Sequence, residues 1–184
     1  MRKHILSVII KKPFGNLFRQ KHVLVVCQDN NGKIILGGKK AYPEGISRLL
    51  GGGVDSSDLS LVAAVRREIL EELRINIDEN RFRLLLEIEV NATDSENKKY
   101  SLVTYIYFIK LGTKEKIKPG DDVSSLVYLN VHQLSELVFA YKNIPENLVG
   151  VDGKREFYWK DYGKVYGPIH NWVLEALEEQ QAKQ

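Results

Sequence analysis

The chain has 184 residues, of which 43% are hydrophobic and 28% charged, and its formal net charge is +3. Length and composition suit a single globular α/β domain over residues 1–184 with a sizeable core. The mildly basic balance suits an anionic ligand, but it is too weak and dispersed for a nucleic-acid surface, so DNA is not an expected partner.

The N-terminal stretch "MRKHILSVIIKK" holds too few apolar residues for a signal peptide or a membrane span. The single cysteine, Cys27, lies in the apolar run "HVLVVC", where it has no partner for a disulfide or a metal pair. A buried thiol and a reducing compartment follow. We expect a cytoplasmic protein without a membrane segment.

The first third of the chain predicts strands. Residues 4–12, 22–29 and 32–38 are rich in β-branched residues, and the turn "DNNG" predicts a hairpin over residues 22–38. The glycine run "LLGGGVD" at residues 49–55 follows. A helix is expected over residues 60–73, with Asp58 or Ser60 as its N-cap.

The rest of the chain alternates strands and helices. Residues 81–92 and 100–112 predict two long strands joined by a polar loop, and residues 124–130 predict another strand before a helix at about 131–141. Residues 167–181 form an amphipathic pattern with Pro168 suited to a first helical turn. The order predicts an α/β fold with a mixed sheet covered on both faces.

The helix at residues 60–73 concentrates acidic side chains. Glu68 neighbours both Glu71 and Glu72 on the helix surface, and each like-charged pair costs roughly 0.2–0.5 kcal/mol. Glu72 lies at the edge of the apolar stripe, and Arg67 can reach Glu71 from the side. Partly buried carboxylates need a cation or a proton. Three such oxygen ligands suit Mg²⁺ or Mn²⁺ and suggest metal-assisted attack of water on a phosphate.

The plain alternative is a solvated helix whose acids pair with Arg66, Arg67 and Arg74. The glycine run just ahead of the helix favours the metal site, because glycines let backbone approach a ligand closely.

These residues resemble the Nudix hydrolase signature, G-x5-E-x7-R-E-U-x-E-E-x-G-U, where U is a bulky aliphatic residue. The matching positions are Gly53, Arg67, Glu68, Ile69, Glu71, Glu72 and Ile75. The resemblance implies the Nudix α/β/α sandwich with a mixed β-sheet. It also implies hydrolysis of a diphosphate linkage in a nucleoside diphosphate joined to another moiety.

The resemblance assigns roles to residues. Glu68, Glu71 and Glu72 would ligate Mg²⁺ or Mn²⁺ together with the carbonyl of Gly52. Arg67 would orient the glutamates. Gly52 and Gly53 would lie against the nucleotide or nucleotide-conjugate substrate.

Two positions depart from the signature. The first glutamate falls on Leu59, although the adjacent Asp58 could take its place if the loop shifts by one residue. The last glycine is Arg74, where a glycine would close the helix in a left-handed conformation. We expect the chain to leave the helix differently, using Asn76.

A further acid could join the site from a loop on the far side of the groove. Asp121 and Asp122, just before the strand at residues 124–130, are the best candidates, and Asp122 is our choice as an additional metal ligand. A polar turn capped by aspartates explains both residues equally well. Glu87 and Glu89, which alternate along one strand, are weaker candidates.

Other signals favour structural roles. The stretch at residues 155–172 is unusually aromatic; one ring could stack on a nucleobase, and the others would pack the C-terminal helix or form a homodimer contact. Lys39 or Lys40 could meet a substrate phosphate, but a solvated hairpin end explains them better. His170 is expected to be structural.

The sequence leaves the substrate open among nucleoside triphosphates, dinucleoside polyphosphates and nucleotide sugars. The proline that marks many ADP-ribose hydrolases has no counterpart. A second hypothesis is a nucleotide-binding or sensor module that lost turnover, motivated by Leu59 and Arg74, although no helix-turn-helix accompanies it. A third is an isomerase on the same fold, which would need Cys27 as a catalytic residue.

Overall fold

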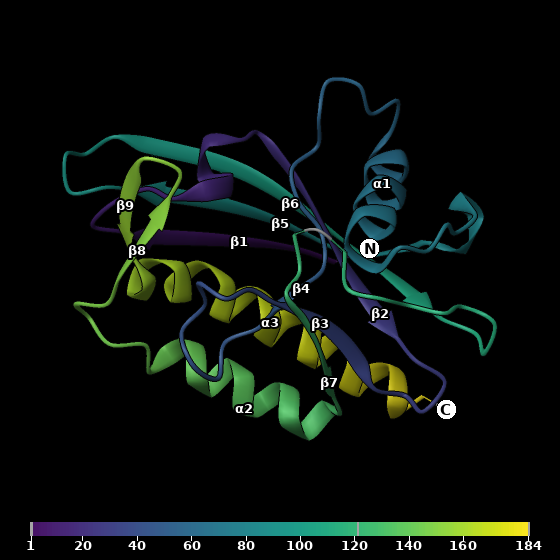
Figure 1. The fold of residues 1–184 in the computed structure, drawn as a ribbon. Coiled ribbons are helices and arrows are strands. Elements are labelled where there is room, and N and C mark those ends of the chain that lie inside the picture. Colours follow the sequence, from purple (N-terminus) through teal and green to yellow (C-terminus); the bar gives the residue numbers. More distant parts are fainter. Residues whose placement is uncertain (1, 121, 184) are drawn as a thin grey trace.

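A computed structural model describes residues 2–120 and 122–183 of the chain (Figure 1). The strands are β1 (Arg2–Ile9), β2 (Lys21–Gln28), β3 (Ile34–Gly38), β4 (Arg48–Leu49), β5 (Arg83–Thr93), β6 (Lys99–Lys110), β7 (Ser125–Leu129), β8 (Val149–Asp152) and β9 (Arg155–Tyr158). The α-helices are α1 (Leu61–Leu73), α2 (Val131–Lys142) and α3 (Trp159–Gln181), and short 3₁₀ turns are η1 (Gly15–Phe18) and η2 (Glu79–Arg81).

Seven strands form one mixed sheet. Its order is β1-β5-β6-β2-β3-β4, with β7 paired to β3; β1 runs parallel to β5 and β2 parallel to β6. The predicted hairpin at residues 22–38 exists, but β2 and β3 pair only next to their turn, through Cys27 with Ile35 and Gln28 with Ile34. Beyond that point the same edge of β3 pairs with β4, through Leu36 with Leu49 and Gly37 with Arg48, whereas β7 pairs with the other edge of β3 along its whole length. The glycine run lies beside β2, where isolated bridges join Gly53 to His22 and Leu50 to Val25.

The sheet lies between two helical layers. Helix α1 covers one face, and α2 and α3 cover the other (Figure 1). Strand β2 is buried on both faces: Val23 and Val25 belong to the apolar cluster under α1, whereas Leu24 and Val26 belong to the cluster under α2 and α3. Such a continuous apolar strand is typical of a sheet covered on both sides. The predicted α/β/α sandwich is confirmed.

The predicted start of the C-terminal helix is wrong. Helix α3 begins at Trp159, so Pro168 lies inside the helix and not in its first turn. Two glycines let α3 approach α2 closely: a Cβ on Gly163 would lie 2.5 Å from the carbonyl oxygen of Tyr141, and one on Gly167 would lie 3.2 Å from its Cβ. This close packing holds the first turns helical despite the glycines and the proline.

The β8–β9 hairpin and η1 are among the short elements that were not predicted. The β8–β9 hairpin leads directly into α3, and η1 precedes β2. They pack on each other: Gly15 N donates to Asp152 Oδ2 (3.0 Å), and the Arg155 guanidinium lies 4.2 Å from the Phe18 ring centroid. Together they extend the molecule beside the N-terminal end of β2. No helix in the described part of the chain is both long and apolar enough to cross a membrane.

Candidate active site

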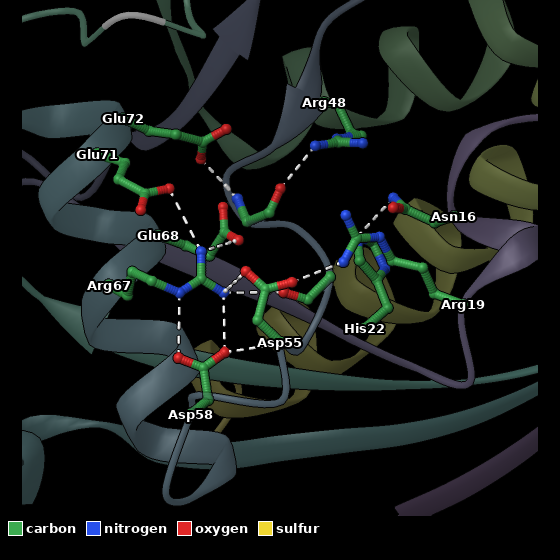
Figure 2. Close-up of polar contacts among 12 residues, drawn as sticks. Asn16, Arg19, His22, Arg48, Asp55, Asp58, Arg67, Glu68, Glu71 and Glu72 are labelled. Carbon is green, nitrogen blue, oxygen red and sulfur yellow. Dashed lines mark hydrogen bonds and ion pairs between the residues drawn. The ribbon is translucent and has the colours of Figure 1, made fainter. Parts of the chain in front are cut away.

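A cavity of about 550 Å³ lies between α1, the glycine run and the β8–β9 hairpin. This volume is in the range of small-molecule sites. Three kinds of side chain face it: carboxylates from α1, cationic groups from several elements, and aromatic rings from the β3–β4 loop and the start of α3. Figure 2 shows the polar part of this site, with the acidic helix on one side and Arg48 and Arg19 on the other.

Gly51 joins the acidic and basic sides. Its N–H donates to Glu72 Oε2 (2.6 Å), and its carbonyl oxygen accepts a hydrogen bond from Arg48 Nη2 (2.6 Å). Glu72 and Arg48 accordingly reach this segment from opposite directions (Figure 2). Gly51 has φ +127°, and a Cβ there would lie 2.2 Å from the carbonyl oxygen of Val23. Only glycine fits this position.

Gly52 and Gly53, which were expected to lie against the substrate, also line the cavity, but side chains of the protein occupy the space that they leave. A Cβ on Gly52 would lie 2.5 Å from Glu68 Oε1, and one on Gly53 would lie 2.3 Å from Arg19 Cδ. The carbonyl oxygen of Gly52, expected to help bind the metal, accepts a hydrogen bond from Val23 N (2.9 Å). One of its two lone pairs is therefore already used.

Arg67 organises the acidic side chains (Figure 2). Its Nε and Nη2 donate to the two oxygens of Asp58 (3.0 and 2.9 Å), and Nη2 also donates to the carbonyl of Gly53 (2.9 Å). Its Nη1 donates to Glu68 Oε1 (2.8 Å) and Glu71 Oε2 (3.3 Å). All five donors of the guanidinium are satisfied, so Arg67 fixes both the loop and the glutamates.

Asp58 takes the place expected of the first signature glutamate. Its side chain is 5% exposed, and the hydrogen bonds from Arg67 hold its pKa below the usual range. Leu59, at the position that the signature assigns to the glutamate, is 99% exposed. The suggested one-residue shift of the loop is what the structure shows.

Arg74 keeps the conformation of the glycine that it replaces. Its φ is 59° and its N–H donates to the carbonyl of Leu70, which closes α1 with a left-handed residue. The expectation that the chain exits through Asn76 is wrong; Asn76 Oδ1 instead accepts a hydrogen bond from Arg66 Nε. Left-handed closure by a residue other than glycine costs roughly 1 kcal/mol. At the other end of the helix, Ser60 is the N-cap, accepting from Ala63 N (3.0 Å).

The two inward-facing glutamates are buried. Glu72 is 4% exposed and Glu68 is 8% exposed. Burial raises the pKa of Glu72 to about 7, against the opposing effect of Arg48, and burial also raises the pKa of Glu68. Glu71 is half exposed at the cavity mouth. These carboxylates are therefore poorly balanced by the cations around them.

The side chains that line the cavity carry more negative than positive charge. Six carboxylates and four cationic side chains line it among the described residues. The carboxylates are Asp55, Glu68, Glu71, Glu72, Asp122 and Asp152, and the cations are Arg19, Lys39, Arg48 and Arg67. Hard oxygen ligands with excess negative charge fit Mg²⁺ or Mn²⁺. In residues 2–120 and 122–183, however, no three acidic, histidine or cysteine side chains converge on one point. Arg67 engages one oxygen of Glu68 and one of Glu71, which leaves the second oxygen of each carboxylate for an ion.

The remaining candidates divide between the cavity and the rest of the molecule. Asp122 lines the cavity, whereas Asp121 lies outside the described residues. Glu87 pairs with Lys3 and Glu89 accepts from Asn91, both away from the cavity.

Two other residues are also internal. His170 is fully buried between Leu49 N and the carbonyl of Tyr166, which confirms a structural role. Cys27 is fully buried in β2 and does not line the cavity, and burial raises the pKa of its thiol. This placement removes the basis of the isomerase hypothesis.

Several residues of the site were not predicted. The aromatic wall combines Phe157, Trp159 and Tyr162, from the stretch singled out in the sequence, with Tyr42 and Phe14, which were not. Arg19, Arg48 and Asp55 were missed as well; Arg19 pairs with Asp55 (2.8 Å) beside Arg67. Of these three residues, only Asp55 could have been suspected from the sequence, because it ends the glycine run.

The NUDIX domain family matches residues 18–148 by its sequence model. No curated protein sequence matches the chain. Solved structures of similar fold include the NUDIX domain of Shewanella oneidensis NrtR complexed with ADP ribose, with 16% identity, a TM-score of 0.56, and coverage of 89% of this chain and 88% of that one.

Two further structures are similar. The mMutator MutT protein from Bacillus halodurans has 17% identity and a TM-score of 0.52, over 64% of this chain and 72% of that one. The dihydroneopterin triphosphate pyrophosphohydrolase of E. coli has 13% identity and a TM-score of 0.50, over 67% and 88%. Because the family match extends over most of the chain and includes the glycine run and the acidic helix, this chain belongs to the Nudix family.

Proposed function

We propose that the chain is a divalent-metal-dependent pyrophosphohydrolase that cleaves the diphosphate linkage of a nucleoside diphosphate joined to another moiety. The single observation that carries the proposal is the pair of buried glutamates, Glu68 and Glu72, at the wall of a cavity whose carboxylates outnumber its cations. A structural helix gains nothing from burying these charges, whereas a metal and a phosphate would balance them.

The residues of the site would have two roles, binding the metal and positioning its ligands. Glu68, Glu71 and Glu72 would hold Mg²⁺ or Mn²⁺, with Asp122 and the second lone pair of the Gly52 carbonyl as further oxygen donors. When bound, such an ion neutralises phosphate charge and activates water. Arg67 positions Glu68 and Glu71 through its Nη1. Gly51 N holds one oxygen of Glu72, which leaves the other oxygen to face the cavity.

The aromatic wall supports a substrate with a flat ring. Tyr42, Trp159 and Tyr162 line the same cavity as the glutamates, and aromatic faces stack on any nucleobase. The NrtR domain of similar fold was crystallised with ADP ribose. ADP-ribose therefore belongs in the substrate panel beside nucleoside triphosphates, dinucleoside polyphosphates and nucleotide sugars.

A second candidate function is a nucleotide-binding module without turnover. The observation in its favour is that Arg67 already holds Glu68 and Glu71 and that no three metal-binding side chains converge in the described residues. The structure compensates both departures from the signature, which argues against this second function. Asp58 restores the contact to Arg67, and Arg74 restores the left-handed helix end.

Phosphate or nucleoside monophosphate release from the panel, with Mg²⁺ or Mn²⁺ and with EDTA, tests the proposal. Wild type is compared with Glu72→Gln and with the control Glu87→Gln, which changes a carboxylate outside the cavity. Turnover that needs the metal, survives in the control and falls at least about a hundredfold in Glu72→Gln supports the hydrolase. Nucleotide binding without turnover of any member of the panel would favour the binding module.

A further inference from the structure

Arg48 is a half-buried cation that forms no ion pair with a carboxylate of the described residues. It opens β4 and faces the cavity, and one of its Nη atoms donates to the carbonyl of Gly51 (2.6 Å). Its guanidinium carbon lies 5.6 Å from the centroid of the Tyr166 ring. No Asp or Glu in residues 2–120 and 122–183 lies within ion-pair distance of it. A guanidinium has five donors, so its contacts with Gly51 and Tyr166 leave further donors for a ligand.

Lys39 brings a second cation to the same place. It follows the last residue of β3 and lines the cavity, and its ammonium forms no ion pair with the described carboxylates. Arg48 and Lys39 lie close enough to Glu72 that both oppose the rise in its pKa caused by burial. With Tyr42 and Glu72 they also surround a small recess of about 10 Å³ beside the main cavity. The two cations thus meet at one side of the cavity, next to the acidic wall.

This arrangement fits an anion better than it fits a structural role. Partial burial costs a cation free energy unless its charge is compensated, and a carbonyl and an aromatic face compensate Arg48 in part. A guanidinium fork beside a mobile ammonium is a common way to bind a phosphate group, the first by paired hydrogen bonds and the second as a point charge. The neighbouring glutamates weaken the binding of such an anion, and a divalent cation between them would strengthen it.

We propose that Arg48 and Lys39 form an anion subsite on the β3–β4 side of the cavity. It binds one phosphate group of the substrate, while the other phosphate group faces Glu68 and Glu71. This inference rests on the proposed function for the identity of the ligand, a nucleoside diphosphate derivative. It adds a residue pair that selects for the diphosphate itself. Removing either cation should weaken the binding of phosphorylated ligands and leave the binding of the nucleoside unchanged.

The test measures binding, not turnover. Isothermal titration in EDTA follows ADP, inorganic pyrophosphate and adenosine on wild type, Arg48→Met and Lys39→Met. Lys40→Met is the matched control, because Lys40 is the adjacent exposed lysine and does not line the cavity. We expect the Kd for ADP and pyrophosphate to rise about tenfold or more in Arg48→Met and severalfold in Lys39→Met, with adenosine and the control unaffected.

Arg48→Lys separates binding from bracing of Gly51. If Arg48 binds the phosphate, the lysine variant keeps part of the affinity for pyrophosphate. If Arg48→Met does not fold, Arg48→Lys and Lys39→Met decide the question. The proposal is overturned if folded Arg48→Met and Lys39→Met bind ADP within about twofold of wild type, or if wild type binds no pyrophosphate at about 10 mM.

The outcome is independent of the hydrolase test. Anion binding that depends on both cations, together with no turnover of any nucleotide, would keep the subsite and overturn the proposed activity. Turnover that needs Glu72, together with unchanged phosphate binding in Arg48→Met and Lys39→Met, would support the proposed activity and overturn the subsite.

Discussion

Replacing Glu72 by glutamine should make the metal-free protein less sensitive to pH. The Glu72 carboxyl is 4% exposed, and burial raises its pKa to about 7 from an ordinary 4.5. The native state therefore binds a proton that the unfolded chain releases at lower pH. This group contributes stability that is fully present below pH 4.5 and is lost as the pH rises through 7.

The size of the effect follows from the same values. Each pKa unit corresponds to about 1.4 kcal/mol, so the carboxyl loses about 3 kcal/mol of stabilisation between pH 4.5 and 7. Glutamine has nearly the same shape and its amide oxygen can still accept the hydrogen bond from Gly51 N, but it has no charge to desolvate. The variant should therefore avoid this loss and be more stable than wild type at pH 8.

Urea unfolding of both proteins in EDTA at pH 5 and pH 8 measures the difference. We expect the free energy of unfolding of wild type to fall by about 2.5 kcal/mol more than that of Glu72→Gln over this interval, because a small part of the effect is already lost at pH 5. Other carboxyl groups, such as Asp58 with its lowered pKa, contribute equally to both proteins and cancel. Parallel pH profiles of the two proteins would show that Glu72 is not a strained buried carboxylate and would refute the reasoning.

Further substitutions test the loop before α1, the C-terminal end of α1 and the glycine run. Asp58→Asn removes the paired ionic contact with Arg67 and should lower the free energy of unfolding by about 1–3 kcal/mol in urea, whereas Leu59→Ala, at a fully exposed side chain, should change it by less than about 0.5. Arg74→Gly should have a free energy of unfolding about 1 kcal/mol higher than Arg74→Ala, because glycine adopts the left-handed φ of 59° without strain; equal values in urea would contradict this account. Gly51→Ala places a methyl group 2.2 Å from a backbone carbonyl of β2, so circular dichroism should report a protein destabilised by more than about 3 kcal/mol, and a stable variant would disprove the close approach.

The predicted part of the fold is the part set by local periodicity. Strand β2 alternates two buried faces, and α1 carries its apolar stripe and its N-cap Ser60 within one stretch of sequence. The start of α3 was missed because contacts with α2, made across Gly163 and Gly167, keep that segment helical. Such tertiary packing overrides the local preference of glycine and proline.

The site was predictable where one element carries it. Arg67 and Glu68 are adjacent on α1, and helical spacing alone brings Glu71 and Glu72 beside them. Arg48 could not be predicted in the same way. It reaches Gly51 only because β4 pairs with β3 at the edge of the sheet, and its own neighbours in the sequence give no sign of that contact.

The role of the glycine run could be predicted only in part. Its nearness to the acidic helix was evident, but the expectation that it leaves room for a ligand was incomplete. Gly52 and Gly53 make room for the side chains of Glu68 and Arg19, and Gly51 was not singled out although it makes the contact with Glu72. Which side chain fills a glycine's space depends on the folded arrangement.

The central claim is that the carboxylates of α1 bind a divalent cation. Titration of Mn²⁺ followed by electron paramagnetic resonance, on wild type, Glu72→Gln and the control Glu87→Gln, tests it without any nucleotide. The account predicts binding to wild type and to the control that tightens from pH 6 to pH 8, as Glu72 loses its proton, and binding at least about tenfold weaker in Glu72→Gln. Equal binding by wild type and Glu72→Gln, or no binding by wild type at pH 8, would contradict it.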